Sequence, residues 1–426
     1  MSVALTDFEK AMADGSQGDA IAAAMAVLIR YGEILGAERL VETNNVCGAN
    51  IFGPRHSSVL GTTDPQSLFS RFSLNSNGKL EVPQVRAHSC QLIGPRDSRE
   101  WRRQGLTEEV NRQISESEEY LEKLGVNLLN TCTPYQVGNV PKLNEHCAWM
   151  ESSAVVFINS VLGARTNTEG RESAAAAMLT QRIPYSGLHV LEKRRATHRV
   201  RIEQSVVSAF DWNVLGYWLG SAVGEGIPVL DGVSFEPDQV SLKQFGAAAA
   251  SSGDIEMYHI PGVTPEAGSV EEAMGGGRIL EELVFGSREF SQTVERLNVT
   301  APSAREVDFV MIGCPHASLS QVREVARMLD GKRVSESTVL WVFTPGALRE
   351  EADGEGLTAT IERAGGVVMS GTCPAIGQFV PPGTRSFATD SAKQVHYLPA
   401  IMGVMGRFGT TRSCIDAALG GTWRVE

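Results

Sequence analysis

Three cysteines in this sequence are each followed closely by proline, and their thiols could bind a metal or act as nucleophiles. They are Cys132 in "TCTPY", Cys314 in "GCPH" and Cys373 in "TCPAIG". A thiolate is both a good metal ligand and a good nucleophile. The chain has seven cysteines and no C-x-x-C pair, so a metal site would have to combine distant segments. The alternative interpretation is that these cysteines are small buried hydrophobic residues.

Local patterns place two of these cysteines at the ends of predicted strands. The run "EVDFVMIG" before Cys314 is apolar and rich in Val, Phe and Ile, which predicts a buried strand. Ser318 and Gln321 then fit an S-x-x-Q capping box at the start of a helix. A helix over 346–364 and the apolar strand "GGVVMSG" follow. Residues 305–376 therefore predict a doubly wound parallel sheet.

The segment before Cys132 has a similar pattern. "ESEEYLEKLG" predicts a helix that ends at Gly125, and the next residues predict a strand that ends at Cys132. Open parallel sheets bind their ligands at the carboxyl ends of strands, so the three cysteines are candidates for one site. His316, two residues after Cys314, is a candidate catalytic residue.

Composition limits the classes of protein to consider. The 426 residues are enough for two or three domains, and 42% hydrophobic with 21% charged residues is ordinary for a soluble globular protein. A formal net charge of −12 disfavours nucleic acid or an anionic membrane as the main partner. No apolar stretch approaches the length of a transmembrane helix. The first residues lack the pattern of a secretion signal, so a cytoplasmic protein is expected.

A second group of polar residues surrounds the apolar run "SSAVVFINS", which we expect to form a strand. An arginine among Ser, Thr and Asn donors suits two-point recognition of a carboxylate or phosphate. The alternative is a set of helix caps and a surface turn. The candidate substrate-binding residues are Glu151, Asn159, Ser160, Arg165, Thr166 and Asn167, and the candidate catalytic residues besides His316 are Ser152 and Lys393.

These segments together resemble the aconitase X family. The resemblance is carried by "ESSAVVFINSVLGARTN", "IPYSGLH", "KRRAT", "TCTPY", "GCPH" and "ATDSAKQVHYLPAIMG". The opening "LTDFEKAMADGSQGDAIAAAMAVLIRYGEILGAERLVE" is similar as well. The resemblance is collinear over nearly the whole chain, which makes it much more specific than any single motif.

The family resemblance implies an α/β fold with the aconitase-like multi-domain architecture and doubly wound parallel sheets. It also implies an iron–sulfur cluster held by Cys132, Cys314 and Cys373. The implied activity is that of a hydro-lyase, which removes water from a 3-hydroxy acid. An open iron position would act as a Lewis acid on the leaving hydroxide, and Arg165 would bind an anionic group of the substrate.

The expected substrate is cis-3-hydroxy-L-proline, with mevalonate 5-phosphate as the alternative. The sequence departs from the family pattern at "TNNVC" (43–47), at "PQVRA" (83–87) and at "TEGRESAAAA" (168–177). Substrate or cluster surroundings are expected at these places, so the substrate and the cluster type stay open. Arg55 and Arg86 would be spare cations for a phosphate, but they also suit a solvated face.

Two alternatives belong to different classes of protein. One is a cofactor-free cysteine hydrolase or transferase, in which Cys314 is the nucleophile and His316 its base. A helix N-terminus would favour that thiolate, although a base two residues along a strand end usually points away from the nucleophile. The other alternative is a non-catalytic scaffold subunit, which the polar residues of 151–167 argue against.

We expect three regions and a small partner. The regions are 1–205, an N-terminal α/β region with the substrate-binding segment; 206–300, an intervening region; and 301–426, a C-terminal α/β region with two of the cysteines. Family members complete their site with a small swivelling domain, which is fused in some members and a separate subunit in others. The family-like segment "FGTTRSCIDAALGGTWRVE" runs to the last residue. We therefore expect a heterodimer with a small subunit that supplies the proton-abstracting group.

Overall fold

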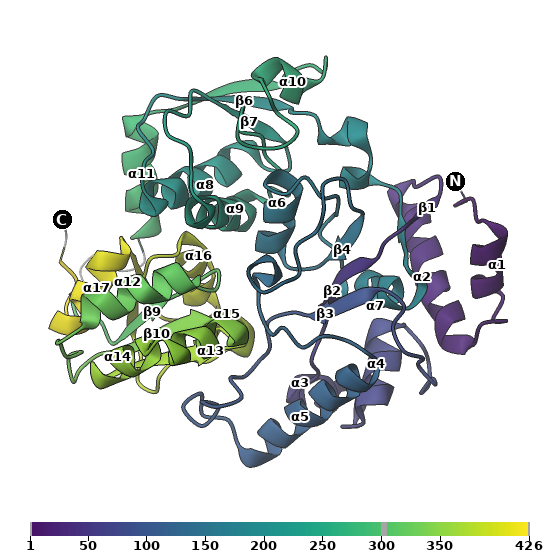
Figure 1. Ribbon diagram of the computed structural model, residues 1–426, viewed down its shortest axis with the longest axis horizontal. Coiled ribbons are helices and arrows are strands. Elements are labelled where there is room, and N and C mark those ends of the chain that lie inside the picture. The colour runs from purple at the N-terminus through teal and green to yellow at the C-terminus, as the bar shows by residue number, and fades with distance from the viewer. Residues whose placement is uncertain (1, 300–304, 425–426) are drawn as a thin grey trace. The chain divides into compact units, whose positions relative to one another are not determined.

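The computed structural model describes residues 2–299 and 305–424, which form two compact units (Figure 1). The first unit runs from the N-terminal residues to Leu92 and includes Leu106–Leu129 and Val140–Arg195. The second unit contains Ile93–Gly105, Asn130–Asn139 and the chain from Ala196 onward.

The first unit contains two small sheets with helices packed against them. Strands β3, β2 and β4 form a parallel sheet in that order, and β1 pairs with β5 in an antiparallel manner. The strands are β1 (Leu40–Glu42), β2 (Asn45–Ala49), β3 (His88–Gln91), β4 (Cys147–Trp149) and β5 (Arg182–Pro184). The helices are α1 (Asp7–Ala13), α2 (Asp19–Leu35), α3 (Pro54–Leu60), α4 (Pro65–Ser73), α5 (Glu108–Lys123), α6 (Ser152–Ser160) and α7 (Arg171–Thr180).

Helices α2 and α7 pack against each other in the core of the first unit. Both helices are rich in alanine, and small side chains let helix backbones approach closely. In α2 the buried residues recur at helical spacing, which explains why this stretch folds as a helix with one apolar face: Ala20, Ile21, Ala24, Met25 and Leu28.

The second unit contains two parallel sheets. Strands β7 (Pro228–Asp231), β6 (His198–Ile202) and β8 (Glu281–Phe285) form the first, in that order. The helices of this part are α8 (Ala209–Val223), α9 (Gln239–Gly253), α10 (Val270–Met274) and α11 (Ser287–Leu297). Helices α8 and α9 pack closely because glycines in α8 bring it against the α9 backbone, and a Cβ at Gly216 would overlap the Phe245 carbonyl oxygen.

The second parallel sheet has five strands in the order β11-β10-β9-β12-β13. Its strands are β9 (Phe309–Ile312), β10 (Val339–Thr344), β11 (Gly366–Ser370), β12 (Ser386–Thr389) and β13 (Met405–Phe408). The helices are α12 (Leu319–Leu329), α13 (Gly346–Gly354), α14 (Leu357–Arg363), α15 (Pro374–Gly377), α16 (Ala392–Met402) and α17 (Thr411–Gly420). The chain moves outward from β9 to β11 and then returns to the other side of β9. This confirms the predicted doubly wound parallel sheet, and it places the topological switch point between β9 and β12.

Alternating side chains of this sheet fill its two faces. Val310 and Ile312 belong to a core cluster with residues of α12, α14 and α17. On the alternate positions, Phe309 and Trp341 pack edge to face with ring centroids 5.2 Å apart. The S-x-x-Q capping box at Ser318 is confirmed at the start of α12.

A turn at Gly313 connects β9 to Cys314. Its φ of +98° lies in the left-handed region, and a Cβ there would overlap the Phe343 carbonyl oxygen. Only glycine fits, so the direction in which the chain leaves β9 toward Cys314 is fixed by the backbone.

Three local expectations are wrong. The run "SSAVVFINS" is the helix α6, not a strand; it is buried from Ser153 to Ser160, and an apolar run of this length does not distinguish a buried helix from a strand. The helix predicted over 346–364 is two helices, α13 and α14, because Gly356 adopts φ +74° between them. Residues 126–132, all described, form no strand but only a bridge between Asn127 and Cys90. Asn130, at φ +48°, turns the chain just before Cys132.

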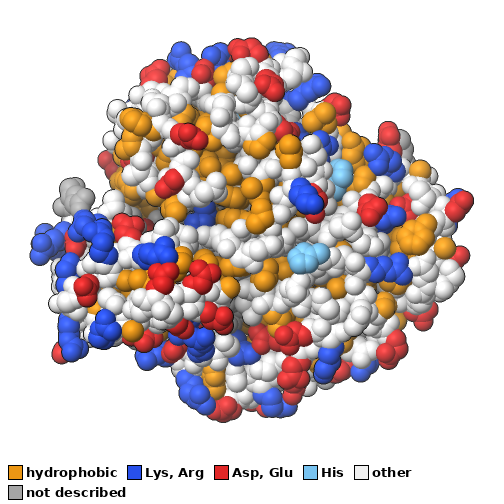
Figure 2. Space-filling view, viewed as in Figure 1, with side chains coloured by type: hydrophobic (Ala, Val, Ile, Leu, Met, Phe, Trp, Pro, Cys, Tyr) orange, Lys and Arg blue, Asp and Glu red, His pale blue; other side chains and the backbone are white. Residues whose placement is uncertain are grey.

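On the face drawn in Figure 2, acidic and basic side chains are interspersed over the surface. No helix within the described parts of the chain is long and apolar enough to cross a membrane.

Candidate functional site

The three candidate cysteines all belong to the second unit and are all buried. Cys314 follows β9 and Cys373 follows β11, at the carboxyl ends of parallel strands of the five-stranded sheet. Cys132 reaches the same unit on the segment Asn130–Asn139 instead of at the end of a strand. Cys373 is also the N-cap residue of the short helix α15.

His316 links the segments that carry these cysteines. Its Nδ1 lies 2.9 Å from Thr131 Oγ1, beside Cys132, and its Nε2 lies 3.0 Å from the carbonyl oxygen of Thr372, beside Cys373. The His316 side chain is fully buried. Both ring nitrogens are therefore used in hydrogen bonds within the unit, and neither is placed to take a proton from Cys314. This geometry does not support the hydrolase alternative, in which His316 activates the Cys314 thiol.

Two of the cysteine sulfurs accept hydrogen bonds from nitrogen donors. The backbone N–H of His316 donates to Cys132 Sγ at 3.4 Å. Gln394 Nε2, from the first turn of α16, donates to Cys314 Sγ at 3.2 Å. Since α16 follows β12, this contact joins the two sides of the topological switch point. Hydrogen-bond donors that point at a sulfur atom stabilise its thiolate form. Such donors are also found around the sulfur atoms of iron–sulfur clusters in proteins.

A buried lysine lies close to the thiols. Lys243 of α9 donates from Nζ to the carbonyl oxygen of His316 (2.8 Å) and to Gln321 Oε1 (2.7 Å). Burial lowers the pKa of Lys243 to about 8, while Cys132, Asp390 and Cys314 act in the opposite direction. The ammonium thus supplies positive charge next to the cysteines.

Asp390 is a buried acid at the end of β12, and it lines a cavity of about 320 Å³ with residues of α8, α12 and α17. Burial raises the pKa of Asp390 to about 6, although a hydrogen bond from Thr411 Oγ1 (2.7 Å) favours its charged form. Asn213 Nδ2 donates to the Asp390 carbonyl oxygen at 3.1 Å.

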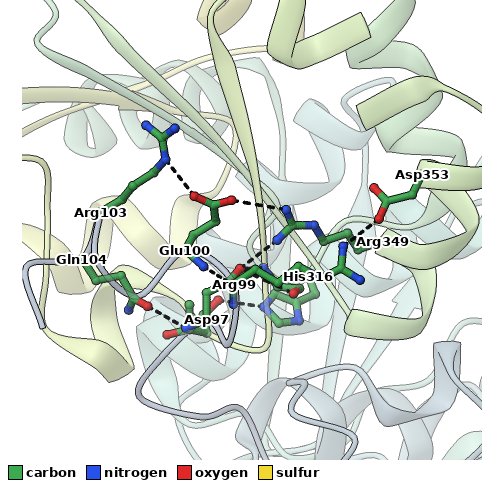
Figure 3. Close-up of polar contacts among 10 residues, drawn as sticks. Asp97, Arg99, Glu100, Arg103, Gln104, His316, Arg349 and Asp353 are labelled. Carbon is green, nitrogen blue, oxygen red and sulfur yellow. Dashed lines mark hydrogen bonds and ion pairs between the residues drawn. The ribbon is translucent and has the colours of Figure 1, made fainter. Parts of the chain in front are cut away.

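A buried ion pair holds the strand that leads to Cys373 (Figure 3). Arg349 Nη1 lies 3.2 Å from Asp97 Oδ2, and both side chains are at most 4% exposed. The same Asp97 oxygen accepts the backbone N–H of Ser370, the last residue of β11, at 2.6 Å. Its other oxygen accepts the backbone N–H groups of Arg99 and Glu100. Asp97 therefore fixes the 97–100 turn against the end of β11.

We expect Asp97→Asn to destabilise the second unit by about 2–4 kcal/mol, because the buried Arg349 then keeps only the longer ion pair with the partly exposed Glu100 (3.6 Å). The matched control is Asp353→Asn, which removes the half-exposed pair between Arg99 and Asp353 (2.7 Å). That change should cost at most about 1 kcal/mol. Urea unfolding of the two variants measures both values, and equal losses would contradict this difference.

The predicted substrate-binding residues lie in the first unit, where several form hydrogen bonds to the chain itself. Asn159, in the last turn of α6, donates to the Thr166 carbonyl oxygen and accepts the Thr166 N–H, at 2.8 and 3.0 Å. Thr166 Oγ1 accepts the N–H of Trp149. Asn167 Oδ1 accepts the N–H of Leu188 at 2.8 Å. These bonds hold the 161–168 loop in place.

Arg165 extends from this loop toward two histidines. Its Nη2 donates to Asn144 Oδ1 at 2.9 Å, and its Nη1 donates to the His189 carbonyl oxygen at 3.3 Å. His146 Nδ1 and His189 Nδ1 lie 3.0 Å apart. Burial lowers the pKa of His146 to about 4, and burial lowers that of His189 to about 3, with Arg165 contributing to both.

The histidine pair predicts a pH dependence of stability. Both pKa values are lower in the folded chain than the ordinary value of 6.5, so the unfolded chain binds more protons. The stability contribution of the pair is complete above about pH 6.5 and is lost as the pH falls from 6.5 through 4 toward 3. The free energy of unfolding, measured by urea titration across this range, should fall less steeply in His189→Gln. If the free energy of unfolding fell equally steeply with pH in His189→Gln and in wild type, the lowered pKa of His189 would be contradicted.

The remaining predicted residues of this group lie at the ends of helices. Glu151 is the N-cap residue of α6 and accepts a hydrogen bond from Ser153 Oγ at 2.9 Å. Ser152 is the first residue of α6 and is half-buried, whereas Ser160 is the last and is buried. Lys393, in the second unit, is half-buried in the first turn of α16.

The described parts of the chain contain no group of three or more His, Cys, Asp or Glu side chains that could hold a single metal ion. The donor chemistry fits an iron–sulfur cluster better, because three buried thiols belong to one unit and two of them accept hydrogen bonds from nitrogen. A cluster distributes its thiolate ligands over several irons, so those ligands need not converge on one ion.

Sequence reasoning did not single out five of the residues around the thiols. Asp97, Thr131, Thr372 and Gln394 act through hydrogen bonds that join distant segments, and no local pattern marks them. The sequence around Lys243 does contain a pattern that could have identified it. Lys243 is the one charged residue in the helical stretch "QVSLKQFGAAAASSG", which is otherwise apolar, small or uncharged. A charge there is buried and must have partners.

Comparison with known proteins identifies relatives over most of the chain. Family models described as the aconitase X first, second and third domains match residues 2–192, 196–295 and 307–420. The phosphomevalonate dehydratase large subunit of Methanocaldococcus jannaschii is 34% identical, over 93% of this chain and 95% of that protein. The cis-3-hydroxy-L-proline dehydratase of Pseudomonas aeruginosa is 31% identical, over 98% of this chain and 70% of that protein.

A solved structure is similar over the same extent. The crystal structure of aconitase X from Thermococcus kodakaraensis, in its holo-form, matches 98% of this chain and all of that chain. The TM-score is 0.81 and the sequence identity is 30%.

Proposed function

Because this chain belongs to the aconitase X family, we propose that it is the large chain of a hydro-lyase that removes water from a hydroxy acid. The observation that carries the proposal is that relatives named as dehydratases are more than 30% identical over more than nine tenths of this chain. The buried thiols of the second unit are where we place the chemistry. The proposed location is the cytoplasm.

Cys132, Cys314 and Cys373 are proposed to hold an iron–sulfur cluster. When bound, the cluster would supply a Lewis-acidic iron to a substrate hydroxyl, since hydroxide is otherwise a poor leaving group. The chain itself contributes the hydrogen bonds to Cys132 and Cys314 and the buried Lys243 ammonium, which favour anionic sulfur. The burial of all three thiols limits access of water to them.

The proposed substrate is cis-3-hydroxy-L-proline. Mevalonate 5-phosphate is the second candidate, because the Methanocaldococcus jannaschii relative is matched over 95% of its length. A phosphate would need additional cations, and Arg86 was one that the sequence offered. Its guanidinium instead donates to Gln17 Oε1 at 2.8 Å and contacts Met12 Sδ at 3.4 Å. Arg86 is therefore engaged within the chain, and of the two cations that the sequence offered, Arg55, in α3, is the one that a bound phosphate would use.

A small partner chain is the third part of the proposal. The Methanocaldococcus jannaschii relative is named a large subunit, and this chain matches it over almost its full length. The Pseudomonas aeruginosa relative is longer, since the match covers only 70% of it. We propose that a separate small chain supplies the group that removes the proton.

Anaerobic purification followed by iron and sulfide analysis tests the proposed cofactor. The proposal expects iron, acid-labile sulfide and a broad visible absorbance that oxygen or a chelator removes. A protein that stays colourless and iron-free after anaerobic reconstitution would contradict the proposed cluster. The alternative would then be a thiol reaction without a cofactor.

Arg165→Lys tests the proposed binding of the substrate carboxylate. Lysine keeps the charge but loses the planar pair of donors, so kcat/KM should fall on the order of 10–100-fold with unchanged iron content. Arg39→Lys is the control, since Arg39 is also in the first unit and stacks on Tyr185. Steady-state kinetics with the assembled enzyme measure the change, and an unaltered kcat/KM would give Arg165 a structural role only.

A further inference from the structure

We propose that His316 is a positioning residue that holds the three cysteine segments in place before a cluster is bound. The inference rests on the proposed function only in taking these cysteines as the cluster ligands. The hydrogen bonds of His316 themselves do not depend on it.

The imidazole ring joins two segments that are distant in sequence. Thr131, which precedes Cys132, lies on one side of the ring, and the carbonyl group of Thr372, which precedes Cys373, lies on the other. Figure 3 draws His316 together with Asp97 and Arg349, which are also buried. All three residues in these contacts are fully buried, so water does not compete for the bonds.

The partners determine which ring nitrogen carries hydrogen. A carbonyl oxygen only accepts, so Nε2 must donate to Thr372. When the ring is neutral, Nδ1 accepts from the Thr131 hydroxyl, and Thr131 Oγ1 in turn accepts the backbone N–H of Thr133 at 3.1 Å. Every donor in this chain of bonds has an acceptor. For the neutral ring, the network specifies one tautomer, and it specifies one ring orientation.

The backbone of His316 continues the same connections. Its N–H donates to Cys132 Sγ, and its carbonyl oxygen accepts from Gln136 Nε2 (3.0 Å) and from Lys243 Nζ (2.8 Å). Cys314 lies only two residues before His316, on the turn fixed by Gly313. One residue therefore touches the segments of Cys132 and Cys373 and is itself on the segment of Cys314.

A rigid ring with nitrogens at both ends is what this position needs. An amide side chain of Asn can replace Nδ1 but is too short to reach the Thr372 carbonyl, whereas Gln can place its amide nitrogen near the position of Nε2. Because Cys132 is not held by a strand, its placement depends more strongly on these bonds than that of Cys314 or Cys373.

The test compares His316→Gln, His316→Asn and His316→Ala with the wild-type chain. His259→Ala is the matched control, since His259 is also buried in the second unit but lies beside β7. The first readout needs no metal: it is the alkylation rate of each cysteine in the iron-free protein, resolved by mass spectrometry of peptides. The second is iron bound per chain after anaerobic reconstitution, and thermal unfolding shows that each variant is folded.

We expect Cys132 to be alkylated at least 10-fold faster in His316→Ala and His316→Gln than in wild type, with a smaller change in His316→Asn, which keeps the bond to Thr131 beside Cys132. Iron bound per chain should fall in the same order, and His259→Ala should leave both readouts unchanged. Folded His316 variants with wild-type alkylation rates would overturn the inference. If the wild-type chain binds no iron, the cluster proposal fails, but the alkylation rates still decide the role of His316.

Discussion

Cys314→Ser is expected to lose bound iron and to lower kcat/KM by about 10³-fold or more. Serine is a much poorer ligand for iron than a thiolate. The substitution would therefore remove the Lewis-acid assistance of the iron, which lowers the activation free energy by several kcal/mol. At about 1.4 kcal/mol for each tenfold in rate, that range corresponds to a thousandfold or greater loss. Cys132→Ser and Cys373→Ser should behave similarly. Iron analysis, visible absorbance and kinetics of the reconstituted enzyme measure the effect.

Cys414→Ser is the matched control for this prediction. Cys414 is fully buried in α17 and packs in the core between α12, α17 and β9, not at the strand ends. The substitution should cost about 1 kcal/mol of stability, as is typical for a point mutation in a core, but should leave iron content and kcat unchanged. Equal loss of iron in Cys414→Ser and Cys314→Ser would show that the loss of a thiol acts through folding. Retention of iron in Cys314→Ser would show that Cys314 is not a ligand.

Omission of the small partner chain is the second change with a large expected effect. The large chain alone should bind its cluster normally but dehydrate substrate about 10²–10⁴-fold more slowly, which is the usual contribution of a positioned general base. Titration of the large chain with the candidate small chain, followed by the initial rate of dehydration, measures this.

Full activity of the large chain alone would contradict the proposed partner. The base would then be sought within this chain, first at Ser152 and Lys393, which are half-buried, and then at Ser160, which is buried at the end of α6. The visible absorbance of the large chain serves as the control in both outcomes, because the proposed ligands are all in this chain.

The elements with strong local signals could be predicted from the sequence. The strands β9 and β11 are short apolar runs flanked by Gly and Pro, and α12 begins with a capping box. Such signals depend on near neighbours in the sequence, and they were enough to predict the doubly wound parallel sheet. The position of Cys314 and Cys373 after strands follows from the same patterns.

Features that depend on tertiary contacts could not be predicted in this way. The burial of α6 on all sides removes the helical period that would have marked it. Asn130 adopts φ +48°, a conformation that its neighbours in the sequence do not mark. His316 was predicted to be catalytic from its place beside Cys314. The structure surrounds it with hydrogen-bond partners from residues 131, 136, 243 and 372, which no local pattern could bring together.

The most direct test of a hydroxy-acid hydro-lyase is loss of water from a defined substrate by the assembled enzyme. The reconstituted large chain and its small partner are incubated anaerobically with cis-3-hydroxy-L-proline and, separately, with mevalonate 5-phosphate. The masses of the products are then measured by mass spectrometry. We predict a product lighter by one water from cis-3-hydroxy-L-proline, and none in the Cys314→Ser enzyme. Unchanged masses for both compounds, with an iron-loaded and fully assembled enzyme, would contradict the proposed function.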